Sequence, residues 1–189
     1  MKKIYLLLLL AFAISCTENT IHESTEEQTD TTVIETEDID LPEIKTSTVD
    51  SSFLGLLKPN ESTAILTAYY QMKDDLIASD AEKVKTSAAN LVEAYPDSIP
   101  QLDSVIILTT LIRESADLDV QRRVFKSLSE NLYPILVANK DTTAKTMFLQ
   151  YCPMALEYEG GEWISNSEEV INPYFGDEML HCGSVHEKF

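Results

Sequence analysis

Two pairs of sulfur-bearing residues near the C-terminus are the residues best suited to chemistry. Cys152 and Met154 are two positions apart, and Met179 and Cys182 are three positions apart. Thiolates and thioethers are soft ligands that prefer Cu(I), and borderline ions such as zinc, over oxygen-loving cations. If the two pairs meet in the fold, they predict a metal site suited to Cu(I) or Ag(I).

The local sequence allows each pair to face one ion. Side chains two positions apart in an extended chain project to the same side, so Cys152 and Met154 can act together, and Pro153 between them restricts the backbone. Gly176 and Gly183 flank the second pair and let the chain bend around an ion. The expected ligand set is Cys152, Met154, Met179 and Cys182.

A disulfide between Cys152 and Cys182 is the alternative. Disulfides are favoured in exported proteins, and this bond would close a loop of about 30 residues, which stabilises a fold by about 3 to 4 kcal/mol in the chain-entropy model. The methionines favour a metal site because a disulfide needs neither, although a methionine can also fill a core. Zinc held by the two cysteines, His181 and His186 would leave both methionines unexplained.

The N-terminus has the pattern of an export signal. Lys2 and Lys3 precede the apolar run Ile4–Ile14, and the small residue Ser15 is followed by Cys16. We expect a lipoprotein signal peptide over residues 1–15 and a lipid on Cys16, so the protein would be exported and anchored to an envelope membrane. The alternative is a plain secretory signal that leaves Cys16 free. The apolar run is too short to span a membrane.

Residues 16–50 are predicted to form an acidic, disordered tether. Residues 17–50 contain eleven acidic residues against the single base Lys45, and few large apolar side chains. The rest of the chain, from about Ser51, is also acidic, and the whole protein has a formal net charge of −18. This charge argues against nucleic acid or anionic lipid as a binding partner.

Residues 51–140 carry four stretches of helical periodicity. The stretches begin near Asn60, at Ser79 with a capping box to Glu82, at Pro100, and at Asp117 or Asp119. Their apolar stripes are Ile65, Tyr69, Met72 and Leu76; Val84, Ala88, Leu91 and Tyr95; Val105, Leu108 and Ile112; and Val120, Val124, Leu128, Leu132 and Ile135. Short connections between amphipathic helices favour antiparallel neighbours, so the predicted fold is mainly α, an antiparallel four-helix bundle.

Residues 141–189 are predicted to form a small β and loop element that packs on the bundle and carries the metal site. Met147–Tyr151 and Trp163–Ile164 read as two strands around a turn at Gly160-Gly161. The aromatic residues Trp163, Tyr174 and Phe175 would form its apolar core or a wall of the metal site. The sequence contains no set of residues that indicates catalysis, so we expect a protein that is not an enzyme.

The C-terminal segments resemble those of a known group of proteins. Residues 151–155 (YCPMA), 161–166 (GEWISN), 171–176 (INPYFG) and 179–183 (MLHCG) are similar to a family of uncharacterised exported domains. These domains occur as single lipoproteins and as the C-terminal extension of periplasmic adaptor subunits of Cus-type copper and silver efflux pumps. The resemblance covers about residues 62–187, and its C-terminal motif is specific whereas its helical part is generic. The resemblance implies heavy-metal binding by the four sulfur residues and an efflux system as partner. His181 departs from the family pattern and leaves a mixed nitrogen and sulfur site open.

Overall fold

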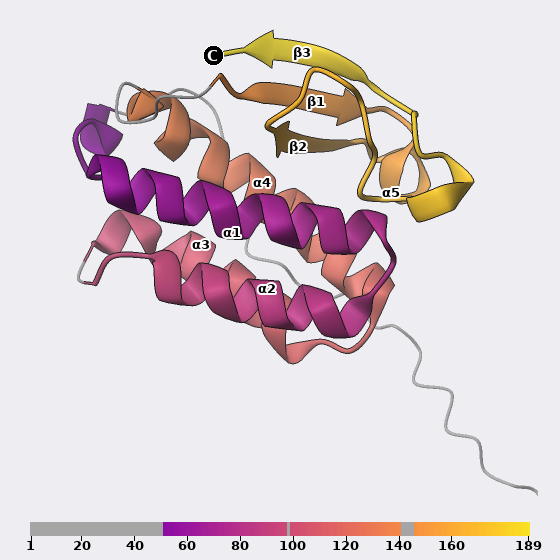
Figure 1. Ribbon diagram of the computed structural model, residues 1–189, viewed down its shortest axis with the longest axis horizontal. Helices are drawn as coiled ribbons and strands as arrows, with labels where there is room; N and C mark the ends of the chain where they lie inside the picture. The colour runs from indigo at the N-terminus through magenta and orange to yellow at the C-terminus, as the bar shows by residue number, and fades with distance from the viewer. Residues whose placement is uncertain (1–50, 98, 141–145) are drawn as a thin grey trace, which may run out of the picture. The chain divides into compact units, whose positions relative to one another are not determined.

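Four long helices precede a small sheet in the computed structural model, which describes residues 51–97, 99–140 and 146–189 (Figure 1). The helices are α1 (Pro59–Ile77), α2 (Ala81–Ala94), α3 (Asp103–Glu114) and α4 (Leu118–Ala138). The C-terminal elements are β1 (Phe148–Cys152), the short helix α5 (Ala155–Tyr158), β2 (Gly161–Ser165) and β3 (Ser184–Lys188). Short 3-10 turns cover Ser51–Phe53, Pro100–Leu102 and Gly176–Glu178. The predicted signal peptide, Cys16 and the acidic tether lie outside the described residues.

The apolar stripes of the four helices form the core. Each long helix packs against the next along the chain, and every predicted stripe residue is buried except Val120, which is half-buried against the core. The side chains that are predicted to be inside are therefore confirmed for all four helices. Within the described residues no helix has the length and hydrophobicity needed to cross a bilayer.

The predicted N-cap of α2 is wrong by one residue. Ser79 has a φ of 54°, a left-handed conformation that ends α1 and cannot begin α2. Asp80 is the N-cap instead, because its Oδ1 accepts a hydrogen bond from the backbone N–H of Lys83 at 3.1 Å. The predicted capping box of Ser79 and Glu82 is therefore replaced by a cap at the next residue. At α4, Asp117 is the N-cap, as one of the two alternatives predicted.

The sheet has three antiparallel strands in the order β2-β1-β3. Cys152 is paired with Gly161 at the end of the ladder between β1 and β2, so β1 ends one residue later than predicted and Gly161 belongs to β2 rather than to the turn. The third strand, β3, was not predicted. Its pairing with β1 shifts register between Leu149 and Gln150, which leaves His186 as the additional residue of β3.

The sheet lies over α1 and α4 (Figure 1), and side chains of these two helices hold it there. The backbone N–H of Ile164 in β2 donates to the hydroxyl of Tyr69 at 3.1 Å, and this hydroxyl lies 2.6 Å from Oγ of Ser129 on α4. Ser129 in turn donates to the carbonyl of Phe125 at 2.8 Å. One buried hydrogen-bonded chain therefore fixes the height of β2 over α1 and α4.

Candidate functional site

Cys152 and Cys182 meet and form a disulfide, with their Cα atoms 5.8 Å apart and 30 positions between them in the sequence. Cys152 is the last residue of β1 and is fully buried, whereas Cys182 lies in the loop before β3 and is half-buried. Both a disulfide and a two-thiolate metal site require this juxtaposition. Because the thiolate is the ligand form, the disulfide-bonded pair does not bind metal as it stands.

A buried asparagine shapes the loop that carries Cys182. The Asn172 side chain donates to the carbonyl of Cys182 at 2.8 Å, and its backbone N–H donates to the carbonyl of Leu180 at 2.7 Å. The Asn172 side-chain oxygen accepts from the N–H of Tyr174 at 2.7 Å. Asn172 therefore fixes the backbone on both sides of residue 181, a role that its residue type alone does not indicate.

Gly183 brings the same loop against Trp163. Its φ is +135°, and a Cβ at this position would lie 2.7 Å from the carbonyl oxygen of Tyr151 and 3.1 Å from the ring of Trp163. A side chain therefore has no room there. The buried indole N–H of Trp163 has no hydrogen-bond partner within the described residues. The only tryptophan of the chain thus lies directly beneath the residue that follows Cys182.

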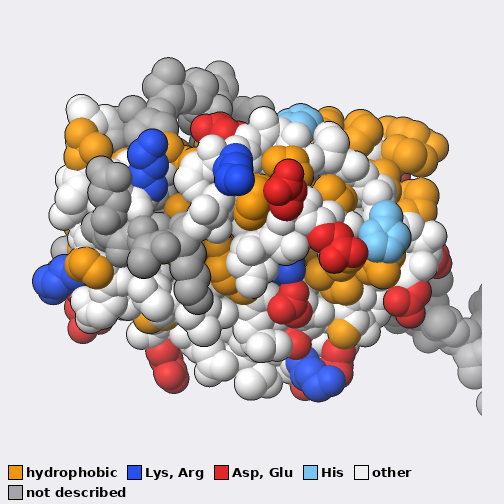
Figure 2. Space-filling model, turned by 45° about the horizontal axis from the view of Figure 1, so that its top comes forward, with side chains coloured by type: hydrophobic (Ala, Val, Ile, Leu, Met, Phe, Trp, Pro, Cys, Tyr) orange, Lys and Arg blue, Asp and Glu red, His pale blue; other side chains and the backbone are white. Residues whose placement is uncertain are grey.

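Each candidate methionine lies close in sequence to one of the cysteines, Met154 after Cys152 and Met179 before Cys182. Met154 is half-buried, packs against the core and precedes α5. Met179 is half-buried at the end of the 3-10 turn, and its carbonyl accepts from the N–H of Cys182 at 3.0 Å, which closes a tight turn. Figure 2 shows apolar side chains gathered at the end of the sheet region where α5 lies.

The two histidines have other contacts. His181 is exposed, and its Nδ1 donates to the carbonyl of Val170 at 3.1 Å. His186 lies in β3, where its ring is 4.7 Å from that of Tyr151. In this disulfide-bonded form, the part of the chain that the structure describes contains no group of three or more His, Cys, Asp or Glu side chains placed to hold a metal ion.

The short helix α5, which follows Met154, has a strained backbone. Three successive residues, Leu156, Glu157 and Tyr158, have φ values of 51°, 58° and 73°, in the left-handed region. Each such residue costs roughly 1 to 2 kcal/mol. A 3.2 Å ion pair between Glu159 and Arg123 of α4 follows α5 and holds its end. Strained backbone that persists next to a candidate site indicates a conformation imposed by its surroundings.

The aromatic residues connect the site to the helices. The ring centroids of Trp163 and Tyr174 are 5.9 Å apart, and those of Tyr174 and Phe125 are 6.1 Å apart. The hydroxyl of Tyr174 donates to the carbonyl of Glu162 at 2.5 Å, and burial raises the pKa of this hydroxyl. Phe175 is half-buried against the core. Trp163 and Tyr174 therefore serve as core, and Trp163 also lies next to the cysteine loop.

Arg122 of α4 attaches the loop between β2 and β3 to the helices. Its Nε donates to the carbonyl of Pro173 at 3.2 Å, and its terminal nitrogen donates to Oγ of Ser79 at 3.0 Å. Burial lowers the pKa of this guanidinium. Residues 151–189 themselves contain eight acidic residues and one basic residue, Lys188. This excess of negative charge favours an approaching cation over an anion.

The chain is similar to an uncharacterised domain family over residues 65–144, which match the model described as "Protein of unknown function (DUF3347)". The match spans most of the helical region and ends before the cysteine pair. The predicted resemblance to an uncharacterised domain family is therefore confirmed for this segment, and the lipoprotein and efflux-pump context stays a prediction. No curated protein and no solved structure matches the chain.

Proposed function

We propose that this protein is an exported lipoprotein that binds one Cu(I) or Ag(I) ion through Cys152 and Cys182 when their disulfide is reduced. The observation that carries the proposal is the meeting of these two sulfurs from segments 30 positions apart, with Cys182 half-buried. A soft ion can reach the pair from the Cys182 side, while the buried Cys152 sulfur supplies the inner ligand.

The chemistry balances as a two-electron reduction followed by ligand exchange. A dithiol reductant breaks the S–S bond, is itself oxidised to a disulfide, and leaves two thiols on this chain. Binding of the ion then displaces the thiol protons, because the thiolate is the ligand. Met154 and Met179, each close in sequence to one cysteine, would be weaker neutral donors that permit release. Zinc is a less favoured cargo because it leaves the thioethers without a role. No catalytic step is part of the proposal.

The proposed context is metal homeostasis at the cell envelope. The lipid on Cys16 would anchor the protein to a membrane, and residues 17–50 would act as a spacer. The four long helices, interpreted as an antiparallel bundle, would form the scaffold that carries the C-terminal metal-binding element. The resemblance to domains of copper and silver efflux adaptors supports a component of a metal-efflux system as partner.

A second candidate function is supported by the disulfide itself. A permanent Cys152–Cys182 bond would make the C-terminal element a stapled, non-catalytic scaffold for interaction with another envelope protein. In that case the two methionines are core and surface residues without a shared role.

Competitive titration against a Cu(I) chelator separates the two functions. The reduced chain, in a Cys16→Ser background that removes the third thiol, should bind one Cu(I), and Cys152→Ser or Cys182→Ser should weaken binding far more than Met154→Leu or Met179→Leu. Met147→Leu is the matched control, because Met147 is a fully buried methionine that precedes β1.

The scaffold function gives a different result for the reduced chain. Both functions expect the two cysteines to resist alkylation until a reductant is added, but as a second result the scaffold function expects the reduced chain to bind Cu(I) no more tightly than the double cysteine variant. That second result would contradict the metal-binding proposal.

The anchor has its own test. Cys16→Ala should release the protein into the soluble fraction of the envelope without a change in its melting temperature. Membrane association that persists in this variant would contradict the lipid anchor and leave the metal proposal unaffected.

A further inference from the structure

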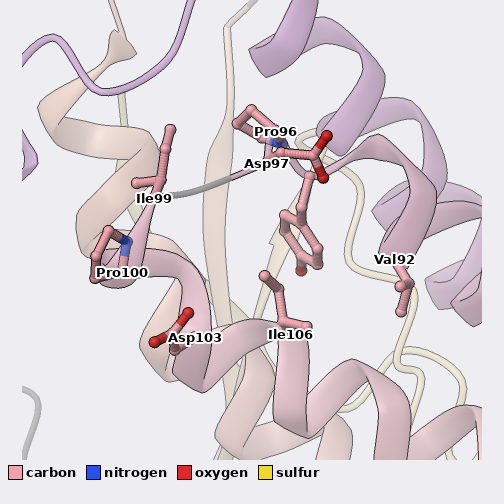
Figure 3. A pocket seen from close by; sticks show the side chains of 8 residues that line it. Val92, Pro96, Asp97, Ile99, Pro100, Asp103 and Ile106 are labelled. Atoms are coloured by element: carbon pink, nitrogen blue, oxygen red, sulfur yellow. The ribbon is translucent and has the colours of Figure 1, made fainter.

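A cavity of about 440 Å³ opens where α2 ends and α3 begins (Figure 3). This volume falls within the range of about 300 to 1,000 Å³ that is typical of small-molecule sites. The cavity is remote from the cysteine loop. Gly176 of that loop packs against Ser79 before the start of α2, and the 14 residues of α2 span about 21 Å to its other end.

Two prolines lie in the wall of the cavity. Pro96 follows α2 and Pro100 begins the 3-10 turn before α3. A residue that precedes proline is driven to extended backbone, and Tyr95 and Ile99 have φ and ψ of −72° and 133°, and −110° and 98°. The backbone before each proline is therefore extended, and the proline rings restrict φ at residues 96 and 100. Both prolines contribute rigid apolar surface to the cavity.

The Tyr95 ring is fixed in the cavity wall. Its hydroxyl lies 3.2 Å from Oγ1 of Thr109 on α3, and this Oγ1 donates to the carbonyl of Val105 at 2.6 Å. The tyrosine hydroxyl is therefore the donor to Thr109 and is already satisfied. Val92 and Ile106 provide further apolar surface from the two helices. A ligand would meet a rigid ring and aliphatic walls.

The polar part of the cavity is negative. Asp97 and Asp103 are its two charged lining residues, both are exposed, and neither is in an ion pair with another described residue. The last turn of α2, which includes Val92, has no basic side chain, so the partial negative charge of the helix C-terminus is uncompensated there. Asp103 also lies in the first turn of α3, where it stabilises the helix.

We propose that this cavity binds a small organic ammonium ion with an apolar body, such as an arylalkyl ammonium. The apolar part would contact Tyr95, Val92 and Ile106, while the charged nitrogen would lie at the rim between Asp97 and Asp103. An anion is repelled by both carboxylates and by the end of α2, and a neutral ligand gains only the apolar contact. This site is independent of the cysteine pair.

Titration of the full chain with 3-phenylpropylammonium, followed by amide NMR shifts, tests the proposal. The shifts should be confined to residues 92–106. The Asp97→Asn/Asp103→Asn double variant should bind the ammonium about ten times more weakly. Each exposed charge pair contributes up to about fivefold in affinity, and the variant removes two carboxylates. The control is Asp177→Asn/Glu168→Gln, which removes the same charge from two exposed residues of the cysteine region. It should bind like the wild type.

The neutral isostere 3-phenylpropanol separates charge recognition from apolar contact. We expect it to bind at least ten times more weakly than the ammonium. Binding of the alcohol as tight as that of the ammonium would overturn the proposal. The same conclusion would follow if the two double variants titrated alike, or if the shifts were scattered over the chain.

Discussion

The helical region, residues 59–138, and the C-terminal region, residues 146–189, are stabilised in different ways. The helices bury regular apolar stripes against their sequence neighbours. The C-terminal region instead depends on single contacts: one disulfide, one buried asparagine, the hydroxyl of Tyr69 and the guanidinium of Arg122. Loss of one of these contacts should therefore destabilise the C-terminal region locally. Loss of a single stripe residue in the helical region should not have such a local effect.

The largest loss of stability is expected at a residue that packs against both regions. The Phe125 ring stacks on Tyr69 at 5.2 Å and lies 6.1 Å from Tyr174. Phe125→Ala should lower the free energy of unfolding by about 3 to 5 kcal/mol, because it leaves a cavity under both regions. Urea unfolding measures this loss. The control is Leu111→Ala on the exposed face of α3, which should change little, and a similar loss in both variants would contradict this role of Phe125.

Reduction of the disulfide should distinguish the regions most clearly. The double variant Cys152→Ala/Cys182→Ala should be less stable by about 3 to 4 kcal/mol in the chain-entropy model. Hydrogen exchange should increase in β1, β3 and the loop between β2 and β3, while α2 and α3 keep their protection. Equal loss of protection in α2 would show that the regions unfold as one unit.

The hydroxyl of Tyr69 is the next largest contribution. Tyr69→Phe leaves the buried N–H of Ile164 without its acceptor, which should cost about 1 to 3 kcal/mol. Tyr70→Phe, at the next residue of the same helix, is the matched control and should cost less. Thermal unfolding of both variants gives the comparison, and equal melting temperatures would argue against the link between α1 and β2.

The smallest effect concerns pH. Burial, with the nearby charge of Glu130, raises the pKa of Glu162. The folded state therefore binds this proton more tightly than the unfolded state, so the stability that it contributes is complete below the ordinary pKa of 4.5 and is lost as pH rises through the raised value. Glu162→Gln should be more stable than the wild type at pH 7 and should lack this decline. Glu168→Gln, at an exposed acid, should retain it; a retained decline in Glu162→Gln would contradict the assignment.

The sequence predicted the helices better than the sheet because their signals differ in range. A stripe such as Ile65, Tyr69, Met72 and Leu76 repeats over about three turns, so one misread residue does not hide it. The strands are five residues long, and β3 is exposed throughout, so it has no alternation of buried and exposed residues to detect. Its position depends on pairing with β1, more than 30 residues earlier in the chain.

At the candidate site, the sequence by itself determined the chemistry: two thiols, two thioethers and an acidic surrounding. It could not decide between a disulfide and a metal site, since both begin from the same residue types. Only the tertiary structure decided that Cys152 and Cys182 are adjacent, that Cys152 is the buried partner, and that Asn172 and Gly183 shape the loop that carries Cys182. The reason is physical: side-chain type is local information, whereas proximity arises when the whole chain packs and brings together residues that the sequence keeps apart.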